Sequence, residues 1–324
     1  MGKPIENPIL EMENLTRYFD IGRNQLVHAV DGINLSIAEK EILGLVGESG
    51  SGKSTLGKVI LGLEPKTSGW IKYRGELLPQ KYKARDFQTW SRKMQMIFQD
   101  PYSSLNPRMT VGEIVGEGLR LTTSNTKNQI KDKVAEWLIK VGLQTDHMSR
   151  YPHEFSGGQR QRIGIARALI LEPEFVVCDE PISALDVSVQ AQVINLMGEL
   201  KEKLGLTLIF IAHDLSMVRY VSDQMAVMYL GSIVEVGKAD DVYFSPKHPY
   251  TEILVGSNPE PDPNVERGRT STTIQGEIPS PVNVPAGCRF ANRCPKVEEN
   301  CKRVTPQLIP LKDSEHKVAC HLYN

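Results

Sequence analysis

The chain of 324 residues lacks the long apolar stretches of a membrane protein. Runs such as Leu208–Ala212 fall far short of the ~20 residues that a bilayer-spanning helix needs. Neither charge is in excess, because 38 Lys and Arg are balanced by 39 Asp and Glu, so a chain-wide basic surface for nucleic acid is excluded. The first residues contain no apolar core of a secretory leader, and we expect a cytoplasmic protein.

Cysteine is scarce and unevenly placed, with five residues in all and four of them after residue 287. An odd number gathered at one end does not fit a secreted disulfide scaffold. The 40% hydrophobic and 24% charged residues are typical of a folded soluble protein. We therefore expect a soluble protein with an unusual C-terminal segment.

Strand-like and helix-like runs alternate along the chain. Strands are predicted around 9–17, 29–37, 41–46, 70–74, 94–98, 175–178, 207–212 and 224–229. Helices are predicted over 53–62, through most of 110–170, and over 187–204. This alternation predicts an α/β fold with a mainly parallel sheet and crossover helices.

The most specific motif is GESGSGKST at residues 47–55, between a predicted strand and a predicted helix. Its glycines allow a tight turn in which successive N–H groups point at a phosphate, beside the positive end of the helix. Lys53 supplies a charge for the β- and γ-phosphates, and Ser54 offers Mg²⁺ a hydroxyl ligand. The predicted ATP-binding residues are Gly47, Ser49, Gly50, Gly52, Lys53, Ser54 and Thr55.

A second site for the metal is predicted where the apolar strand 175–178 ends in Asp179 and Glu180. Ligands gather at the carboxyl ends of strands in open α/β sheets. Asp179 would hold Mg²⁺ through water, and Glu180 would orient or deprotonate the attacking water.

Residues 156–162 read SGGQRQR and follow Phe155. This stretch resembles the signature motif of ATP-binding cassette (ABC) ATPases, whose usual form has Leu in place of Phe155. Ser156 is a good helix N-cap, and the N–H groups of Gly157, Gly158 and Gln159 would form an anion site.

Further family motifs follow in the same order as in ABC ATPases. Gln99 matches the Q-loop glutamine, Asp186 ends the D-loop-like SALD, and His213 matches the switch histidine. Phe19 stands 34 residues before Lys53, at the place where family members carry an aromatic residue that stacks on adenine. Tyr18 is the alternative for this role. The cassette resemblance covers roughly residues 9–255.

The resemblance implies a P-loop NTPase core with an antiparallel β subdomain and a helical subdomain at about 100–170 that receives a transport partner. The cassette would span 1–257. Members of the family work as head-to-tail dimers, in which ATP on Lys53 of one subunit is covered by Ser156–Gln159 of the other. Gln99 would also bind Mg²⁺ and sense the attacking water. The implied activity is hydrolysis of ATP to ADP and phosphate.

Among ABC proteins, the chain resembles the ATPase subunits of the oligopeptide/dipeptide (and nickel) importers. Only 56 residues separate Gln99 from Ser156, which leaves no room for the coiled coil of DNA-repair members. The finer resemblance lies in 45–58, 98–115, 245–254 and 287–295, and GKSTLGK is similar to the second, F-type, ATPase rather than the D-type.

This resemblance implies an enzyme that energises import of di- and oligopeptides. Its partners would be a second ATPase subunit, in a heterodimer or a homodimer, two transmembrane permease subunits and, indirectly, a peptide-binding protein. No nucleic-acid partner is expected. The chain would lie peripherally on the cytoplasmic face of the membrane. The alternatives are another cargo, such as nickel or sugar, and an ABC ATPase outside transport.

After a Pro-rich linker predicted over 258–276, a C-terminal segment, 277–324, carries the clustered cysteines. The resemblance implies that they bind a [4Fe–4S] cluster, which thiolates suit. Zinc, with His316 or His321, and metal-free thiols are the alternatives. The four candidate ligands are Cys288, Cys294, Cys301 and Cys320.

Basic residues of the same segment are expected to offset the negative charge of such a cluster. They are Arg289, Arg293, Lys296, Lys302 and Arg303. The remaining cysteine, Cys178, lies within a predicted buried strand, where it is expected to be a small core residue.

Overall fold

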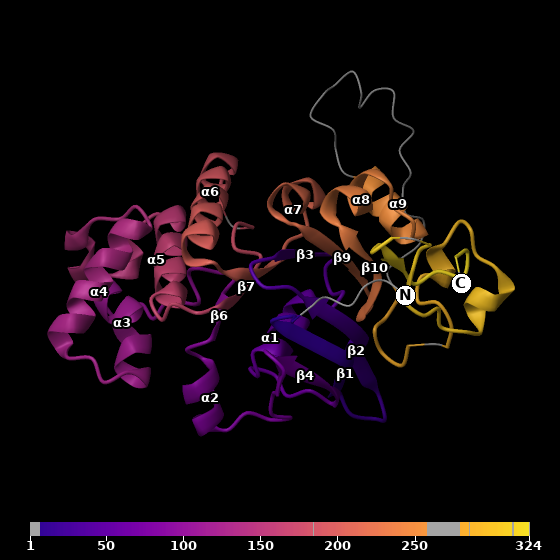
Figure 1. The fold of residues 1–324 in the computed structure, drawn as a ribbon, viewed down its shortest axis with the longest axis horizontal. Coiled ribbons are helices and arrows are strands. Elements are labelled where there is room, and N and C mark those ends of the chain that lie inside the picture. The colour runs from indigo at the N-terminus through magenta and orange to yellow at the C-terminus, as the bar shows by residue number, and fades with distance from the viewer. Residues whose placement is uncertain (1–6, 184, 258–278, 285, 313, 324) are drawn as a thin grey trace, which may run out of the picture. The chain divides into compact units, whose positions relative to one another are not determined.

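The computed structural model describes residues 7–183, 185–257, 279–284, 286–312 and 314–323, in two compact units (Figure 1). The first unit takes in the described parts of Met1–Ile60, Glu64–Gln80 and Ala212–Asn324. The second consists of Leu61–Leu63 and the described parts of Lys81–Ile211. The linker predicted over 258–276 lies outside the described residues.

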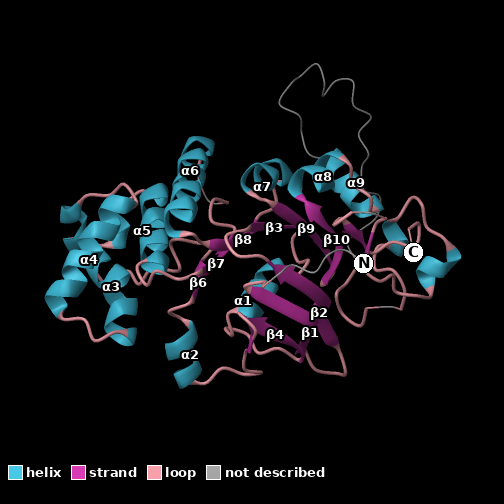
Figure 2. Ribbon diagram, viewed as in Figure 1, coloured by secondary structure: helices cyan, strands magenta, loops and turns pink. Residues whose placement is uncertain are grey.

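An antiparallel sheet in the first unit has the strand order β2-β1-β4-β5 (Figure 2). Its strands are β1 (Leu10–Asp20), β2 (Leu26–Ile37), β4 (Ser68–Tyr73) and β5 (Glu76–Leu77). Leu10, Met12 and Leu15 of β1 are buried, and the residues between them are more exposed. This sheet confirms the antiparallel β subdomain that the family resemblance implies.

The first unit also contains β3 (Ile42–Val46), which runs parallel to β9 (Gln224–Tyr229), and β10 (Ser232–Lys238), which is antiparallel to β9. Every residue of β3 is buried, as expected of a parallel strand that is covered on both faces. The helices of this unit are α1 (Lys53–Ile60), α7 (Leu215–Val221), α8 (Ala239–Phe244) and α9 (Pro249–Gly256).

The C-terminal segment belongs to the first unit and shares its core. It contains β11 (Ile309–Pro310), β12 (Lys317–Val318) and the 3-10 turns η3 (Ala291–Arg293) and η4 (Glu299–Lys302). β12 pairs with β10, and an isolated bridge joins Val27 to Val282. Phe290 and Val318 are buried. The segment therefore extends existing structure and is not a separate module around its cysteines.

The second unit is built on the parallel strands β6 (Met94–Ile97), β7 (Phe175–Asp179) and β8 (Thr207–Ile211). Helices α3, α4 and α5 pack on one another (Figure 1). Its helices and turns are α2 (Ala84–Trp90), α3 (Val111–Thr122), α4 (Lys127–Lys140), η1 (Thr145–Ser149), η2 (Pro152–Glu154), α5 (Gly157–Leu169) and α6 (Val187–Leu204).

Local sequence signals explain where the helices of the second unit begin and end. Thr110 and Glu113 form a capping box at the start of α3, and Thr126 and Gln129 do the same for α4. Helix α6 ends at Gly205, whose φ of 65° is the left-handed conformation that glycine adopts at a helix C-terminus. These helices confirm the predicted helical character of 110–170.

Candidate functional site

The predicted phosphate loop connects β3 to α1 in the first unit. Gly47 has a φ of 150° and Gly52 a φ of 103°, both in the region that favours glycine. A Cβ on Gly47 would lie 2.1 Å from the carbonyl oxygen of Met228, and one on Gly52 would lie 1.9 Å from that of Ala29. Side chains at these two positions would therefore force the loop away from the neighbouring strands.

Lys53 lies back across this loop. Its Nζ donates hydrogen bonds to the carbonyl oxygens of Gly47, at 2.7 Å, and Glu48, at 3.0 Å, and the side chain is buried. Ser54 and Thr55 occupy the first turn of α1, which carries no acidic residue. The positive end of the helix and the lysine charge thus act on the same region, as a phosphate site requires.

Glu48 ties the loop to two distant segments. Arg293 of η3 donates two hydrogen bonds to the Glu48 carboxylate, at 2.8 and 3.1 Å. The backbone N–H of Glu48 donates to the hydroxyl of Tyr250 on α9, at 2.9 Å. Tyr250 and Arg293 lie in the tail stretches that carry the family resemblance, but their contact with the phosphate loop was not predicted.

The two aromatic candidates for adenine binding are adjacent on β1. Tyr18 donates a hydrogen bond to Asp31 at 2.6 Å and stacks on His28, with ring centroids 4.2 Å apart. Burial and the Asp31 contact raise the pKa of Tyr18 to about 12. Phe19 is partly exposed and packs against the Arg17 guanidinium, 4.2 Å from its ring centroid. Because Tyr18 has these partners, Phe19 remains the preferred candidate.

Asp31 of β2 forms a second contact with the C-terminal segment, the tail, through Arg289. Its carboxylate accepts hydrogen bonds from Tyr18 and Arg289, and it is paired with His28. Burial by itself would raise the pKa of Asp31, but these hydrogen bonds and the charge of Arg289 outweigh burial and lower it. Asp31 therefore stays ionised and holds the tail to β2.

His213 lies two residues after the end of β8 in the chain and belongs to the first unit, where it is exposed. The next residue, Asp214, caps α7 by accepting a hydrogen bond from the N–H of Met217 at 3.1 Å. This cap fixes the backbone beside His213 and leaves its imidazole at the surface.

In the second unit, Gln99 and Glu180 are brought together. The side-chain amide of Gln99 donates to the Glu180 carboxylate at 2.8 Å, across 81 residues of sequence. Glu180 has a φ of 44°, a strained conformation for a residue other than glycine, and its N–H donates to the carbonyl of Ile211 at 3.0 Å. Asp179 ends β7 and is buried.

The SGGQ stretch forms the N-terminus of α5. Ser156 caps the helix by accepting from the N–H of Gln159, and the Gln159 side chain accepts from the N–H of Ser156 at 3.0 Å. A Cβ on Gly158 would lie 2.4 Å from Val189, so α5 approaches α6 closely there. Ser156 is exposed, so the capped start of the helix lies at the surface at this residue.

Asp186 stands at the N-cap of α6, yet its side chain makes no cap hydrogen bond. It is exposed, and the next residue, Val187, is 82% exposed. Asp186 and Val187 are therefore both accessible at the start of α6.

The predicted site residues fall into two groups. The first unit contains the phosphate loop, Phe19 and His213, and the second contains Gln99, Asp179, Glu180, Asp186 and Ser156–Gln159. Within the first unit, Lys53 lies against its own loop, and within the second, Gln99 meets Glu180.

The four tail cysteines lie near one another, but they form no metal site as arranged. Burial raises the pKa of Cys288 to about 11, and the charges of Cys301, Cys320 and Cys294 add to the effect. Across the described parts of the chain, no three or more His, Cys, Asp or Glu side chains are grouped to hold a metal ion. The [4Fe–4S] and zinc assignments remain predictions from the sequence. Cys178 is fully buried in β7, as expected of a core residue.

Each of the tail's basic residues that were expected to offset a cluster's charge is paired with a carboxylate. Their expected role in offsetting that charge stays a prediction from the sequence. Lys296 pairs with Glu252 of α9, and Lys302 and Arg303 pair with Glu299. Arg289 and Arg293 pair with Asp31 and Glu48, far away in the sequence. Arg289, Arg293 and Lys296 therefore attach the tail to the rest of the unit. The charge of Lys296 also acts on Cys294 and Cys320, where it opposes the rise in thiol pKa that burial causes.

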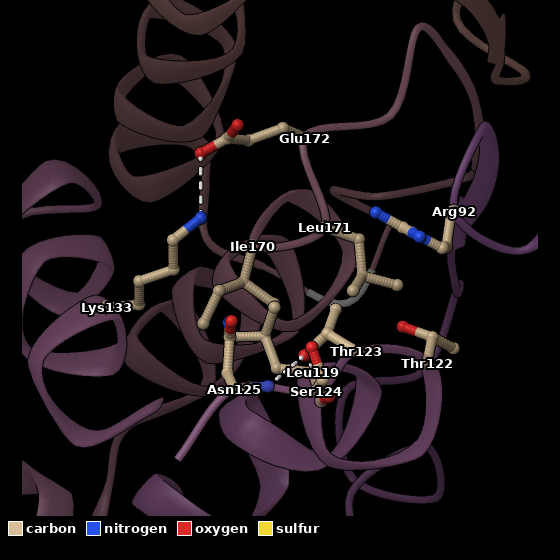
Figure 3. A pocket seen from close by; sticks show the side chains of 10 residues that line it. All are labelled: Arg92, Leu119, Thr122, Thr123, Ser124, Asn125, Lys133, Ile170, Leu171 and Glu172. Carbon is tan, nitrogen blue, oxygen red and sulfur yellow. Dashed lines mark hydrogen bonds and ion pairs between the residues drawn. The ribbon is translucent and has the colours of Figure 1, made fainter. Parts of the chain in front are cut away.

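A polar cavity of about 470 Å³ lies in the helical part of the second unit (Figure 3). It is bordered by the end of α3, the segment that leads into α4 and the end of α5. Lys133 and Glu172 form an ion pair of 3.4 Å at its edge. None of the residues that line it is one of the predicted ATP-site residues.

Two family models match this chain. One, described as ABC transporter, covers residues 30–183, and the other, described as oligopeptide/dipeptide transporter, C-terminal region, covers residues 234–301. The chain is 52% identical over 317 residues to the putative oligopeptide transport ATP-binding protein YkfD of Bacillus subtilis, covering 98% of this chain and 96% of that protein. It is 48% identical over 322 residues to the oligopeptide transport ATP-binding protein OppF of Salmonella typhimurium, covering 96% and 95%.

Solved structures give the same fold. The ATP-binding cassette MJ0796, in a dimeric post-hydrolysis state bound to ADP and Pi, matches with a TM-score of 0.65 and 26% identity, over 71% of this chain and 98% of that chain. CbiO1 from Clostridium perfringens, part of an ABC transporter complex, matches with a TM-score of 0.65 and 28% identity, over 74% and 92%.

Proposed function

Because the chain belongs to the ATP-binding proteins of ABC transporters of the oligopeptide/dipeptide type, we propose that it hydrolyses ATP to power the import of di- and oligopeptides. The phosphate loop carries the ATPase assignment, since its glycine geometry, its lysine and the start of α1 together suit a triphosphate. The names of its relatives support peptides as the cargo.

ATP binding uses the first unit. Lys53 exchanges its carbonyl partners, Gly47 and Glu48, for β- and γ-phosphate oxygens, which offer it a charge-assisted bond. The loop N–H groups, from Ser49 and Gly50 to Thr55, surround the phosphates, and Phe19 stacks on adenine.

Hydrolysis adds the second unit. Glu180 accepts a proton from the attacking water, the new bond forms at the γ-phosphorus, and the bond to the β–γ bridging oxygen breaks to release ADP. Gln99 orients the Glu180 carboxylate through the hydrogen bond between them. His213 contacts the γ-phosphate. Mg²⁺, held by Ser54, Gln99 and Asp179, would neutralise charge on the β- and γ-phosphates.

The catalytic assembly is a dimer, homomeric or with a second ATPase subunit. The N-terminus of α5, Ser156–Gln159, covers the γ-phosphate bound to the other subunit, and Asp186 with Val187 lies in the same interface. The exposure of Ser156, Asp186 and Val187 supports this arrangement. In the described parts of the chain, no helix has the length and apolarity to cross a bilayer. Two permease subunits supply the pathway, and this chain binds them at the cytoplasmic face through its helical region, about 100–170.

For the tail we propose the [4Fe–4S] cluster as the species that brings the four cysteines into one ligand set. What supports it is that Cys294, Cys301 and Cys320 lie close enough to Cys288 for their charges to act on its thiol, and that thiolates are the usual ligands of such a cluster. Anaerobically purified full-length protein should be brown and contain iron and sulfide near four per chain, the stoichiometry of the cluster itself. A colourless sample that contains zinc would replace this assignment with the zinc alternative.

Reconstitution tests the transport function. The full chain, copurified with its permeases and its second ATPase subunit, should take up labelled di- and oligopeptides only when ATP is present on its side of the membrane. The Lys53→Ala variant is the control and should abolish uptake. ATP-dependent uptake of nickel or sugar, with no uptake of peptide, would overturn the assignment of peptides as the cargo.

A further inference from the structure

The tail contacts the phosphate loop through a bidentate ion pair that is largely shielded from solvent. Both terminal nitrogens of Arg293 donate to the Glu48 carboxylate, and the two side chains are 5% and 19% exposed. Contact with Glu48 raises the pKa of Arg293, so the guanidinium is always charged. A paired geometry of this kind is directional as well as strong.

Glu48 is held through each of its polar groups. Its carboxylate binds Arg293, its N–H donates to Tyr250, and its carbonyl accepts from Lys53, the lysine proposed to bind ATP. The residue lies between Gly47 and Ser49, within the loop that is to surround the phosphates. Substitution of Arg293 is therefore expected to shift the backbone of the phosphate loop, on which ATP binding depends.

Arg293 is itself held rigidly. Its N–H donates to the carbonyl of Phe290 at 3.0 Å. Phe290 is buried, and its ring lies 5.3 Å from that of Tyr229 and 5.4 Å from that of Tyr250. Tyr229 also accepts a hydrogen bond from Arg293 at 3.2 Å. The aromatic cluster thus positions the guanidinium against the loop. Arg293 lies on η3, outside the segment that matches the ABC transporter model, 30–183.

We propose that Arg293 is a positioning residue for ATP binding. It fixes the phosphate loop and neutralises a carboxylate that would otherwise stand, half-buried and unpaired, in the loop that receives a triphosphate. An uncompensated negative charge in that place repels the phosphates, and the repulsion is strong where water is excluded. The C-terminal segment is therefore part of the nucleotide site, and its effect falls on ATP affinity rather than on the chemical step.

The test compares charge variants of the full chain, assembled with its partners for turnover and alone for binding of a fluorescent ATP analogue. Arg293→Ala should raise KM and the analogue's Kd about tenfold with kcat within about twofold, since remote coupling of this kind is typically worth a few-fold to tens-fold. Arg293→Lys, which keeps the charge but loses the paired geometry, should fall between.

Removal of the carboxylate separates electrostatics from folding. The double variant Arg293→Ala with Glu48→Gln should recover most of the lost affinity, because the repelling charge is gone. The matched control is Lys296→Ala, which breaks the exposed ion pair of the same segment with Glu252 and should leave KM unchanged. Thermal unfolding identifies any variant that fails to fold.

Wild-type affinity in Arg293→Ala would overturn the inference, and so would a double variant as weak as Arg293→Ala. Loss of turnover with unchanged KM would do the same, since it would place Arg293 in the chemical step. If the parent chain itself bound no ATP analogue, the proposed function would fail, and that outcome is distinct from equal affinity of the parent and Arg293→Ala.

Discussion

The chain carries two helix N-termini suited to phosphate, and they are supported in opposite ways. The loop before α1 is held by residues remote in the sequence: Met228 lies against Gly47, Tyr250 binds the backbone of Glu48, and Arg293 binds its carboxylate. The start of α5 is held by its own residues, since Ser156 and Gln159 cap each other. Lys53 of the first site is buried, although Ser49 and Gly50 of its loop are exposed, and Ser156 of the second site is exposed.

This difference indicates which subunit binds the ATP that each of the two helix N-termini contacts. A loop whose lysine is buried and whose backbone is fixed by remote residues suits a nucleotide bound within one chain. A self-capped helix end with an exposed serine suits a ligand held by another subunit. Variants of the two sites should therefore separate binding from turnover.

Lys53→Ala should have the largest effect on this comparison. Loss of a charge-assisted bond to the phosphates should weaken binding by the isolated chain by about 10- to 100-fold and remove turnover in the assembly. Titration with a fluorescent ATP analogue measures the affinity. Unchanged affinity would show that the loop is not the primary site.

Ser156→Ala should have an intermediate effect, of a different kind. The isolated chain should bind ATP as before, while turnover of the assembled dimer falls about tenfold, since one hydrogen-bond donor to the γ-phosphate is lost. Loss of the cap should also destabilise α5 by about 1 kcal/mol. Weaker binding by the isolated chain would contradict the assignment of this helix end to the other subunit's ATP.

Much of this comparison could be predicted from the sequence, because its signals are local. GESGSGKST and SGGQ each specify a turn and a helix start within a few residues, and both were found where predicted. The strands β3, β7 and β8 are apolar runs that follow their predicted ranges. Gln99 was predicted as a site residue only from its place in the order of the family motifs. The structure adds its contact with Glu180.

The support of the phosphate loop could not be predicted in the same way. Arg293 and Glu48 are 245 residues apart, and no local pattern shows that an arginine beside a cysteine pairs with a carboxylate in a glycine-rich loop. The strand β12 is two residues long, and its pairing with β10 is a matter of tertiary packing. The basic residues of the tail were considered only for their effect on the cysteines, and no local pattern indicated their carboxylate partners.

The last prediction concerns acid stability and not nucleotide binding, through His248, which caps α9 and so supports Tyr250 beside the loop. Its Nδ1 accepts from the Tyr250 N–H at 3.1 Å, and burial lowers the pKa of His248 to about 4, against an opposing effect of Glu235. An unfolded chain binds this proton near pH 6.5, so stability is fully present above about pH 6.5 and is lost as pH falls toward about 4.

The loss attributable to His248 should amount to about 3 kcal/mol over that range. Asparagine keeps a cap acceptor but does not titrate, so His248→Asn should flatten the acid limb of a plot of unfolding free energy against pH. Denaturant unfolding at a series of pH values provides the plot. An acid limb as steep as that of the parent would show that other groups cause the loss.

The central claim, that ATP is bound by one chain and hydrolysed between two with Glu180 as the base, is tested most directly by single-site kinetics of Glu180→Gln in the assembled protein. The variant should bind ATP with parental affinity, accumulate as a closed dimer and turn over about 10²- to 10⁴-fold more slowly, the usual contribution of a positioned base. Turnover near the parental rate, with no trapped dimer, would contradict the account.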